Sequence, residues 1–150
     1  KGKTLGLLGS EGRIATQFRA MAEYMGMEPL GYDKKDSHGK LKDLLKNSDV
    51  VSLHITADEK NRDWFDEKKF KIMKDRAIFL NSSRPWLVEE QGLKWGLNNK
   101  LAGVWYDFTV DLRHPKLVTT DHFGGTTKQS QAKSELLLAR KVEEYIRTNT

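Results

Sequence analysis

The sequence predicts an α/β fold: a doubly wound, Rossmann-type parallel sheet in a three-layer arrangement with helices on both faces. Two observations carry this prediction. Short apolar segments of strand length alternate along the whole chain with segments whose apolar residues have helical spacing. The apolar segments are continuous rather than alternating, which is typical of parallel strands buried on both faces. Right-handed crossovers then favour the doubly wound topology.

Each element follows from its own local pattern. The expected strands end in turn residues, and the expected helices carry apolar side chains three or four positions apart. Gly26 lies where the first helix should end, because glycine readily adopts the left-handed conformation that closes a helix. The expected strands are 3–9, 28–32, 49–55, 76–81, 101–106 and 117–119. The expected helices are 13–25, 40–47, 66–73, 88–97 and 126–147.

Composition bounds the class of protein. A chain of 150 residues with 37% hydrophobic and 31% charged residues fits one globular domain. No apolar run approaches the roughly 18 residues of a membrane span, so we expect no membrane partner. The absence of cysteine excludes disulfides and thiol catalysis, and we expect a cytoplasmic protein. The net charge of +5 fits either a solvated lysine-rich surface or an anionic ligand. The sequence has no stripe of arginine and aromatic residues that would suggest nucleic-acid binding, and we expect no metal site.

A glycine turn joins the first strand to the first helix. We expect Gly9 and Gly12, with Arg13 and Ile14 at the helix start, to bind a pyrophosphate. Glycine allows a tight turn and close approach, and the helix amino end offers free N–H groups and a positive dipole. The usual spacing is G-x-G-x-x-G, whereas here the first gap holds one extra residue. Glu11 in this turn is unfavourable for phosphate, and must point away if a dinucleotide binds.

An aspartate follows the second strand. Asp33 lies 24 residues after Gly9, near the position expected for an acid that binds the adenosine ribose. Such a carboxylate accepts hydrogen bonds from both ribose hydroxyls and repels a 2′-phosphate, which favours NAD over NADP. Lys34 and Lys35 oppose this preference because they could accept that phosphate, so NADP is not excluded. A turn aspartate with no ligand is the alternative interpretation.

Six segments together resemble the cofactor domain of the D-isomer-specific 2-hydroxyacid dehydrogenases, a group that includes phosphoglycerate, glycerate and D-lactate dehydrogenases. The resemblance implies that residues 1–150 are the NAD-binding domain of an oxidoreductase that acts on a 2-hydroxy or 2-oxo acid. It also implies that the substrate domain lies in segments absent from this chain, which begins at Lys1, and it allows a homodimer. The segments are KTLGLLGSEGRIA, MGMEPLGYD, SDVVSLHI, FKIMKDRAIFLNSSR, LAGVWYDF and TTDHFGGTT.

The resemblance also implies site residues. Arg84, in the pattern Asn-x-x-Arg, would clamp the substrate carboxylate and polarise its carbonyl. His122, followed by Phe and two glycines, would be the acid/base that exchanges a proton with the substrate oxygen. The resemblance further implies cofactor contacts. Asp107 would meet the nicotinamide carboxamide, with the other contacts made by Thr56, Ser83 and Gly124.

Three functional loops depart from the family pattern. The glutamate that usually pairs with the histidine is missing, and Asp111 is the nearest acidic substitute. Pro85 and Trp86 replace the usual glycines after Arg84, and the glycine turn carries Ser10 and Glu11. Two interpretations remain: an oxidoreductase with a shifted substrate range, or a catalytically degenerate dinucleotide-binding or structural module of the same fold.

Overall fold

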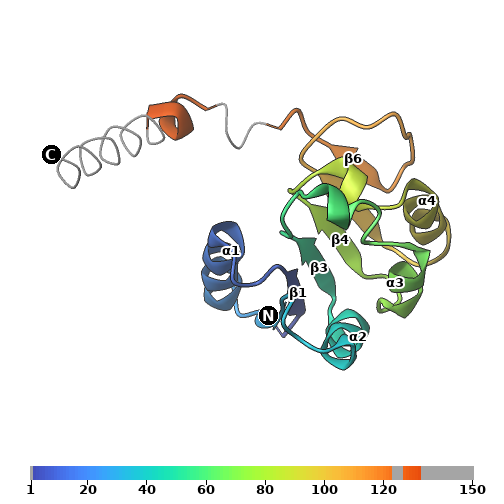
Figure 1. Cartoon of the computed structure of the whole chain (residues 1–150), viewed down its shortest axis with the longest axis horizontal. Helices are drawn as coiled ribbons and strands as arrows, with labels where there is room; N and C mark the ends of the chain where they lie inside the picture. The colour runs from blue at the N-terminus through green and yellow to red at the C-terminus, as the bar shows by residue number, and fades with distance from the viewer. Residues whose placement is uncertain (1, 123–126, 133–150) are drawn as a thin grey trace, which may run out of the picture.

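The computed structural model describes residues 2–122 and 127–132, and its central feature is a six-stranded sheet in which every pair of neighbours is parallel (Figure 1). The strand order is β2-β1-β3-β4-β5-β6. The strands are β1 (Thr4–Leu8), β2 (Glu28–Tyr32), β3 (Val50–Leu53), β4 (Ile78–Asn81), β5 (Gly103–Tyr106) and β6 (Leu117–Thr119). The α-helices are α1 (Arg13–Tyr24), α2 (His38–Asn47), α3 (Glu67–Ile72) and α4 (Glu90–Asn99).

This architecture confirms the predicted fold class and the order of its strands and helices. Gly26 follows α1 with a φ of +75°, in the left-handed conformation expected for a residue that closes a helix. The sequence patterns did not predict the two short 3₁₀ helices, η1 (Glu59–Asn61) and η2 (Pro85–Leu87). Of the predicted helix 126–147, residues 128–132 are helical, and most of the remainder lies outside the described residues. No helix of the described part is long and apolar enough to cross a membrane.

The register of the strands assigns the side chains to two faces. In a parallel sheet, residues in register point to the same side, and successive residues along a strand alternate. One row faces the layer of α2, α3 and α4 and comprises Val51, Phe79 and Val104. The adjacent row points to the side of α1 and comprises Leu7, Ser52, Leu80 and Trp105.

The face beneath α2, α3 and α4 holds the main core. Its centre is a group of aromatic rings: Phe65 lies 4.6 Å from Phe79 and 4.7 Å from Phe70, measured between ring centroids. All three side chains are fully buried. Fully burying one such side chain is worth roughly 1.5–3 kcal/mol of transfer free energy, so this group anchors the helices to the sheet.

The opposite face is covered by α1 only over its first strands, as far as the described residues go. Leu5 and Leu7 of β1 pack there against Ala22 of α1. Farther along the sheet, Ile78 on β4 is 41% exposed and Val118 on β6 is 57% exposed. Parallel sheets normally bury both faces, so this apolar surface is suited to packing against protein beyond the described residues.

Replacing Phe79 with alanine should lower the free energy of unfolding by about 3–5 kcal/mol, because the vacated space lies among rings that are themselves fully packed. Urea denaturation at pH 7 would measure this loss. Tyr24→Ala is the matched control: Tyr24 is 94% exposed, so its loss should stay within about 0.5 kcal/mol. Equal effects of the two substitutions would contradict this account of the core.

Candidate functional site

The glycine turn is held in place by a backbone contact that only glycine permits. Gly9 has a φ of +83°, and a Cβ at this position would lie 2.7 Å from the carbonyl oxygen of His54. The Gly9 N–H also donates to the carbonyl oxygen of Tyr32 at 2.8 Å. The end of β1 is therefore pressed against the loops that follow β2 and β3. These are the strands on either side of β1, where the chain reverses its direction of winding and where ligands bind in such sheets.

The amino end of α1 is open. Gly12 is its N-cap residue, and among the described residues no side chain forms a hydrogen bond that caps it. The first turn of α1 also carries no acidic residue. Free N–H groups and the helix dipole together favour an anion at this position.

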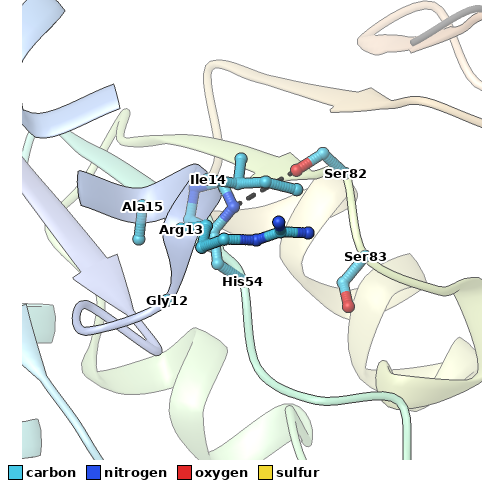
Figure 2. A pocket seen from close by; sticks show the side chains of 7 residues that line it. All are labelled: Gly12, Arg13, Ile14, Ala15, His54, Ser82 and Ser83. Carbon is cyan, nitrogen blue, oxygen red and sulfur yellow. Dashed lines mark hydrogen bonds between the residues drawn. The ribbon is translucent and has the colours of Figure 1, made fainter. Parts of the chain in front are cut away.

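A pocket of about 200 Å³ opens at this helix end (Figure 2). The glycine turn and α1 form one of its walls, and the loops after β3 and β4 form the other. Its lining residues are Gly12, Arg13, Ile14, Ala15, His54, Ser82 and Ser83. The chemistry of this donor set fits a dinucleotide pyrophosphate, because it offers a helix amino end and an arginine to an anion.

Asp33 stands at the end of β2 and is already engaged by the glycine turn. The Ser10 hydroxyl donates to Asp33 Oδ2, and the Glu11 N–H lies 3.4 Å from Asp33 Oδ1. The Glu11 carboxylate forms an ion pair with Lys35. Lys35 compensates the negative charge of Glu11, so this carboxylate does not prevent a phosphate from binding at the helix end.

His54 belongs to the pocket, although sequence patterns assigned it no role. Its Nε2 lies 2.9 Å from Ser52 Oγ, its Nδ1 lies 3.3 Å from Ser82 Oγ, and the ring of Phe18 packs edge-on against it. Burial lowers the pKa of His54 to about 4. A neutral imidazole thus links the loops after β3 and β4. Its position directly after a buried strand was the signal that could have identified it.

The loop after β4 is organised by Asn81, a fully buried polar residue. Its Oδ1 accepts the Ser83 N–H at 2.9 Å, and its Nδ2 donates to the Arg84 carbonyl oxygen at 3.0 Å. The Ser83 hydroxyl donates to the Ile55 carbonyl oxygen at 2.7 Å. This network fixes the backbone around Arg84, whose side chain stays exposed at the sheet edge.

His122 lies beside the end of β5. Its Nδ1 is 2.9 Å from the carbonyl oxygen of Asp107 and 3.4 Å from Asp107 Oδ2. The Thr120 hydroxyl donates to Asp107 Oδ1 at 2.9 Å and holds this carboxylate in position. With Nδ1 occupied, Nε2 is the ring nitrogen left for proton exchange. His122 also has a φ of +55°, which is unusual for a residue with a side chain.

The described residues do not bring every predicted site residue together. Asp111 is exposed and lines two hollows away from the pocket of Figure 2, and His122 contacts Asp107 instead. Thr56 is exposed, with its carbonyl oxygen accepting from Asn61 Nδ2 at 2.9 Å. The predicted contact at Gly124 lies outside the described residues. Within the described part, no group of three His, Cys, Asp or Glu residues is arranged to hold a metal ion.

Comparisons with known proteins agree on one family. Residues 1–124 match the model of the "D-isomer specific 2-hydroxyacid dehydrogenase, NAD binding domain" family. The chain is 32% identical to D-3-phosphoglycerate dehydrogenase of Escherichia coli over 97% of its own length and 40% of that protein. It is 30% identical to D-3-phosphoglycerate dehydrogenase 1 of Saccharomyces cerevisiae, covering 97% of this chain and 37% of the relative.

A solved structure gives the same result. The glyoxylate reductase from Paecilomyes thermophila matches with a TM-score of 0.84 and 27% identity, over 97% of this chain and 50% of that one. The chain therefore spans half or less of the length of these relatives.

The protonation of His54 makes stability depend on pH. A histidine in the unfolded chain titrates near 6.5, whereas the folded protein holds His54 neutral until about pH 4. Between these values the unfolded state binds a proton that the folded state does not, so stability falls as pH is lowered through this window. Urea denaturation at pH 7 and at pH 4.5 would measure how much free energy of unfolding each protein loses between the two pH values. This loss should be smaller in His54→Gln than in wild type, by up to about 3 kcal/mol. An identical loss in both proteins would contradict the buried neutral histidine.

Proposed function

The chain belongs to the D-isomer specific 2-hydroxyacid dehydrogenase family as an NAD-binding domain, and we propose that it serves an enzyme that transfers hydride between NAD and a 2-hydroxy or 2-oxo acid. The observation that carries this proposal is the open amino end of α1, which shares one sheet edge with Asp33, Arg84 and His122. Residues 1–150 are the dinucleotide-binding domain in this proposal. The substrate domain comes from sequence that this chain does not contain.

In this proposal, different residues at the sheet edge bind different parts of the cofactor. Gly9 and Gly12 let the pyrophosphate approach the backbone, with Arg13 and Ile14 at the helix start beside it. Asp33 receives the adenosine ribose. The nicotinamide end would lie toward the loops after β4 and β5, where we assign contacts to Ser83, Asp107 and Gly124, with Thr56 on the adenine side. When bound, NAD supplies the hydride acceptor or donor.

The acid/base chemistry falls to the chain's own residues. Arg84 binds the substrate carboxylate and draws electron density toward the carbonyl oxygen, because a guanidinium is a permanent two-pronged donor. His122 gives its Nε2 proton to that oxygen in reduction and removes it in oxidation. We assign the orientation of this imidazole to Asp107 rather than to Asp111, because Nδ1 lies 2.9 Å from the Asp107 carbonyl oxygen and 3.4 Å from Asp107 Oδ2.

A catalytically degenerate binding module is the second candidate. The observation that favours it lies directly after Arg84, where η2 contains Pro85 and the half-buried Trp86. The Arg62 guanidinium lies over the Trp86 ring, 5.3 Å from its centroid. This packing stiffens a loop next to the substrate arginine and narrows the space beside it. A folded protein that binds NADH but does not turn over any 2-oxo acid would match this candidate.

We also propose that the enzyme is a cytoplasmic homodimer. The exposed apolar side chains of β4 and β6, Ile78 and Val118, support an assembly that covers this face of the sheet.

Asp33→Ala should weaken NADH binding by about tenfold or more, because charge-assisted hydrogen bonds to the ribose are lost. Quenching of tryptophan emission and calorimetry would measure the dissociation constant. Asp75→Ala is the matched control: Asp75 is an exposed aspartate that pairs with Lys100 at the opposite edge of the sheet. If a folded wild-type sample bound no NADH, the proposed function would fail.

In the full-length enzyme, Asp107→Asn should lower kcat by about tenfold. The dissociation constant of NADH should stay within about twofold, because the amide oxygen of Asn can still accept a hydrogen bond from the nicotinamide carboxamide. An amide lacks the negative charge that the Asp107 carboxylate places 3.4 Å from His122 Nδ1, so it orients the imidazole less strongly. His122→Asn provides the reference, with an expected loss of about 10²-fold or more. A selective rise of the NADH dissociation constant in Asp107→Asn would instead assign Asp107 to the nicotinamide carboxamide alone.

A further inference from the structure

The extra residue of the glycine turn changes the adenosine end of the site. The longer turn brings Ser10 and Glu11 to the end of β2, against Gly31. A Cβ at Gly31 would lie 2.6 Å from Ser10 Oγ and 2.7 Å from Arg19 Nη2, so these two side chains pack closely against the strand at this position. The turn and the strand end therefore form a single packed unit.

Within this unit, hydrogen bonds hold the Asp33 carboxylate in place but do not use all of its capacity as an acceptor. The Ser10 hydroxyl donates to one carboxylate oxygen and the Glu11 N–H approaches the other at 3.4 Å. The Asp33 N–H donates to Asp36 Oδ2 at 2.8 Å, which fixes the backbone. An ionised carboxylate has about four lone-pair positions, so Asp33 keeps acceptor capacity for ribose hydroxyls.

Lys35 is a cation close to where a 2′-phosphate would have to sit, two residues after Asp33. Its ammonium is paired with the Glu11 carboxylate, and the hydrogen bond and charge of Glu11 raise the pKa of Lys35. The two side chains are 69% and 63% exposed, so their pairing adds little to folding stability. The pair matters instead for ligand binding, because Glu11 compensates the positive charge that Lys35 would otherwise present to a ligand.

We propose that Glu11 is a specificity-determining residue that makes the site reject a 2′-phosphate and so select NAD over NADP, by neutralising Lys35 beside Asp33. This inference rests on the proposed function. With Glu11 present, a 2′-phosphate meets two carboxylates and one cation that already has a partner. Without it, Lys35 is free to form a charge-assisted hydrogen bond to phosphate. Arg19, whose Nη2 would lie 2.7 Å from a Cβ on Gly31, is another cation beside the end of β2.

The test compares the binding of NADH and NADPH by tryptophan quenching and calorimetry in wild type, Glu11→Gln and Glu11→Gln/Lys35→Ala. Glu11→Gln should raise NADPH affinity about five- to tenfold and leave NADH affinity within about twofold. The double variant should lose this gain, because the cation is gone. Glu67→Gln is the matched control: Glu67 is a partly exposed glutamate paired with Lys71 on α3, outside the site.

The outcomes separate the inference from the proposed function. NADPH affinity that rises in Glu11→Gln and falls again in the double variant supports the inference. Unchanged NADPH affinity in a variant that still binds NADH overturns it and leaves the proposed function standing. A gain that survives Lys35→Ala also overturns it, because another cation such as Arg19 would then donate to the phosphate. Failure of folded wild type to bind either dinucleotide overturns both.

Discussion

The parallel direction of all six strands is the constraint on which the rest of this structure depends. Because every strand runs the same way, all of their carboxyl ends meet at one edge of the sheet. Gly9, Asp33 and His122 are distant in sequence but share that edge. The direction of the strands places them there, and no separate contact between them is needed. The buried rows of the sheet maintain this arrangement, since a slip of one residue would exchange the two faces of a strand.

Polar side chains at the strand ends hold the loops of the site against the sheet by hydrogen bonds. Asn81 ends β4 inside the core and uses both ends of its amide to hold the backbone that carries Ser83 and Arg84. His54 plays a similar part after β3, where its two ring nitrogens face hydroxyls on neighbouring segments. A buried amide or imidazole without partners would be costly, so each constrains the loop that supplies its partner. The site loops are thus positioned by the core rather than by the cofactor.

Sequence patterns could predict the scaffold because its determinants are local. Apolar runs of strand length and helical spacing define the elements, and parallel pairing follows from their alternation, so the sheet was predictable as a whole. The 3₁₀ helix at Pro85–Leu87 was not, because it depends on packing of Trp86 and Leu87 that no short pattern encodes. The partners of site residues were equally hidden. Asp107 and His122 are 15 residues apart, and the adjacent ends of β5 and β6 bring the Asp107 carbonyl oxygen and carboxylate to the imidazole.

The altered loops bear on whether the site has decayed or been modified. Random loss would leave unpaired charges and loosened packing, because no selection would restore them. At the glycine turn, which departs from the family pattern at Ser10 and Glu11, the structure shows paired charges instead. Glu11 has Lys35 as its partner, and the Ser10 hydroxyl donates to Asp33 Oδ2. Substituted side chains that find partners in this way argue against simple decay of the glycine turn, because a decayed loop would not be expected to keep its charges paired.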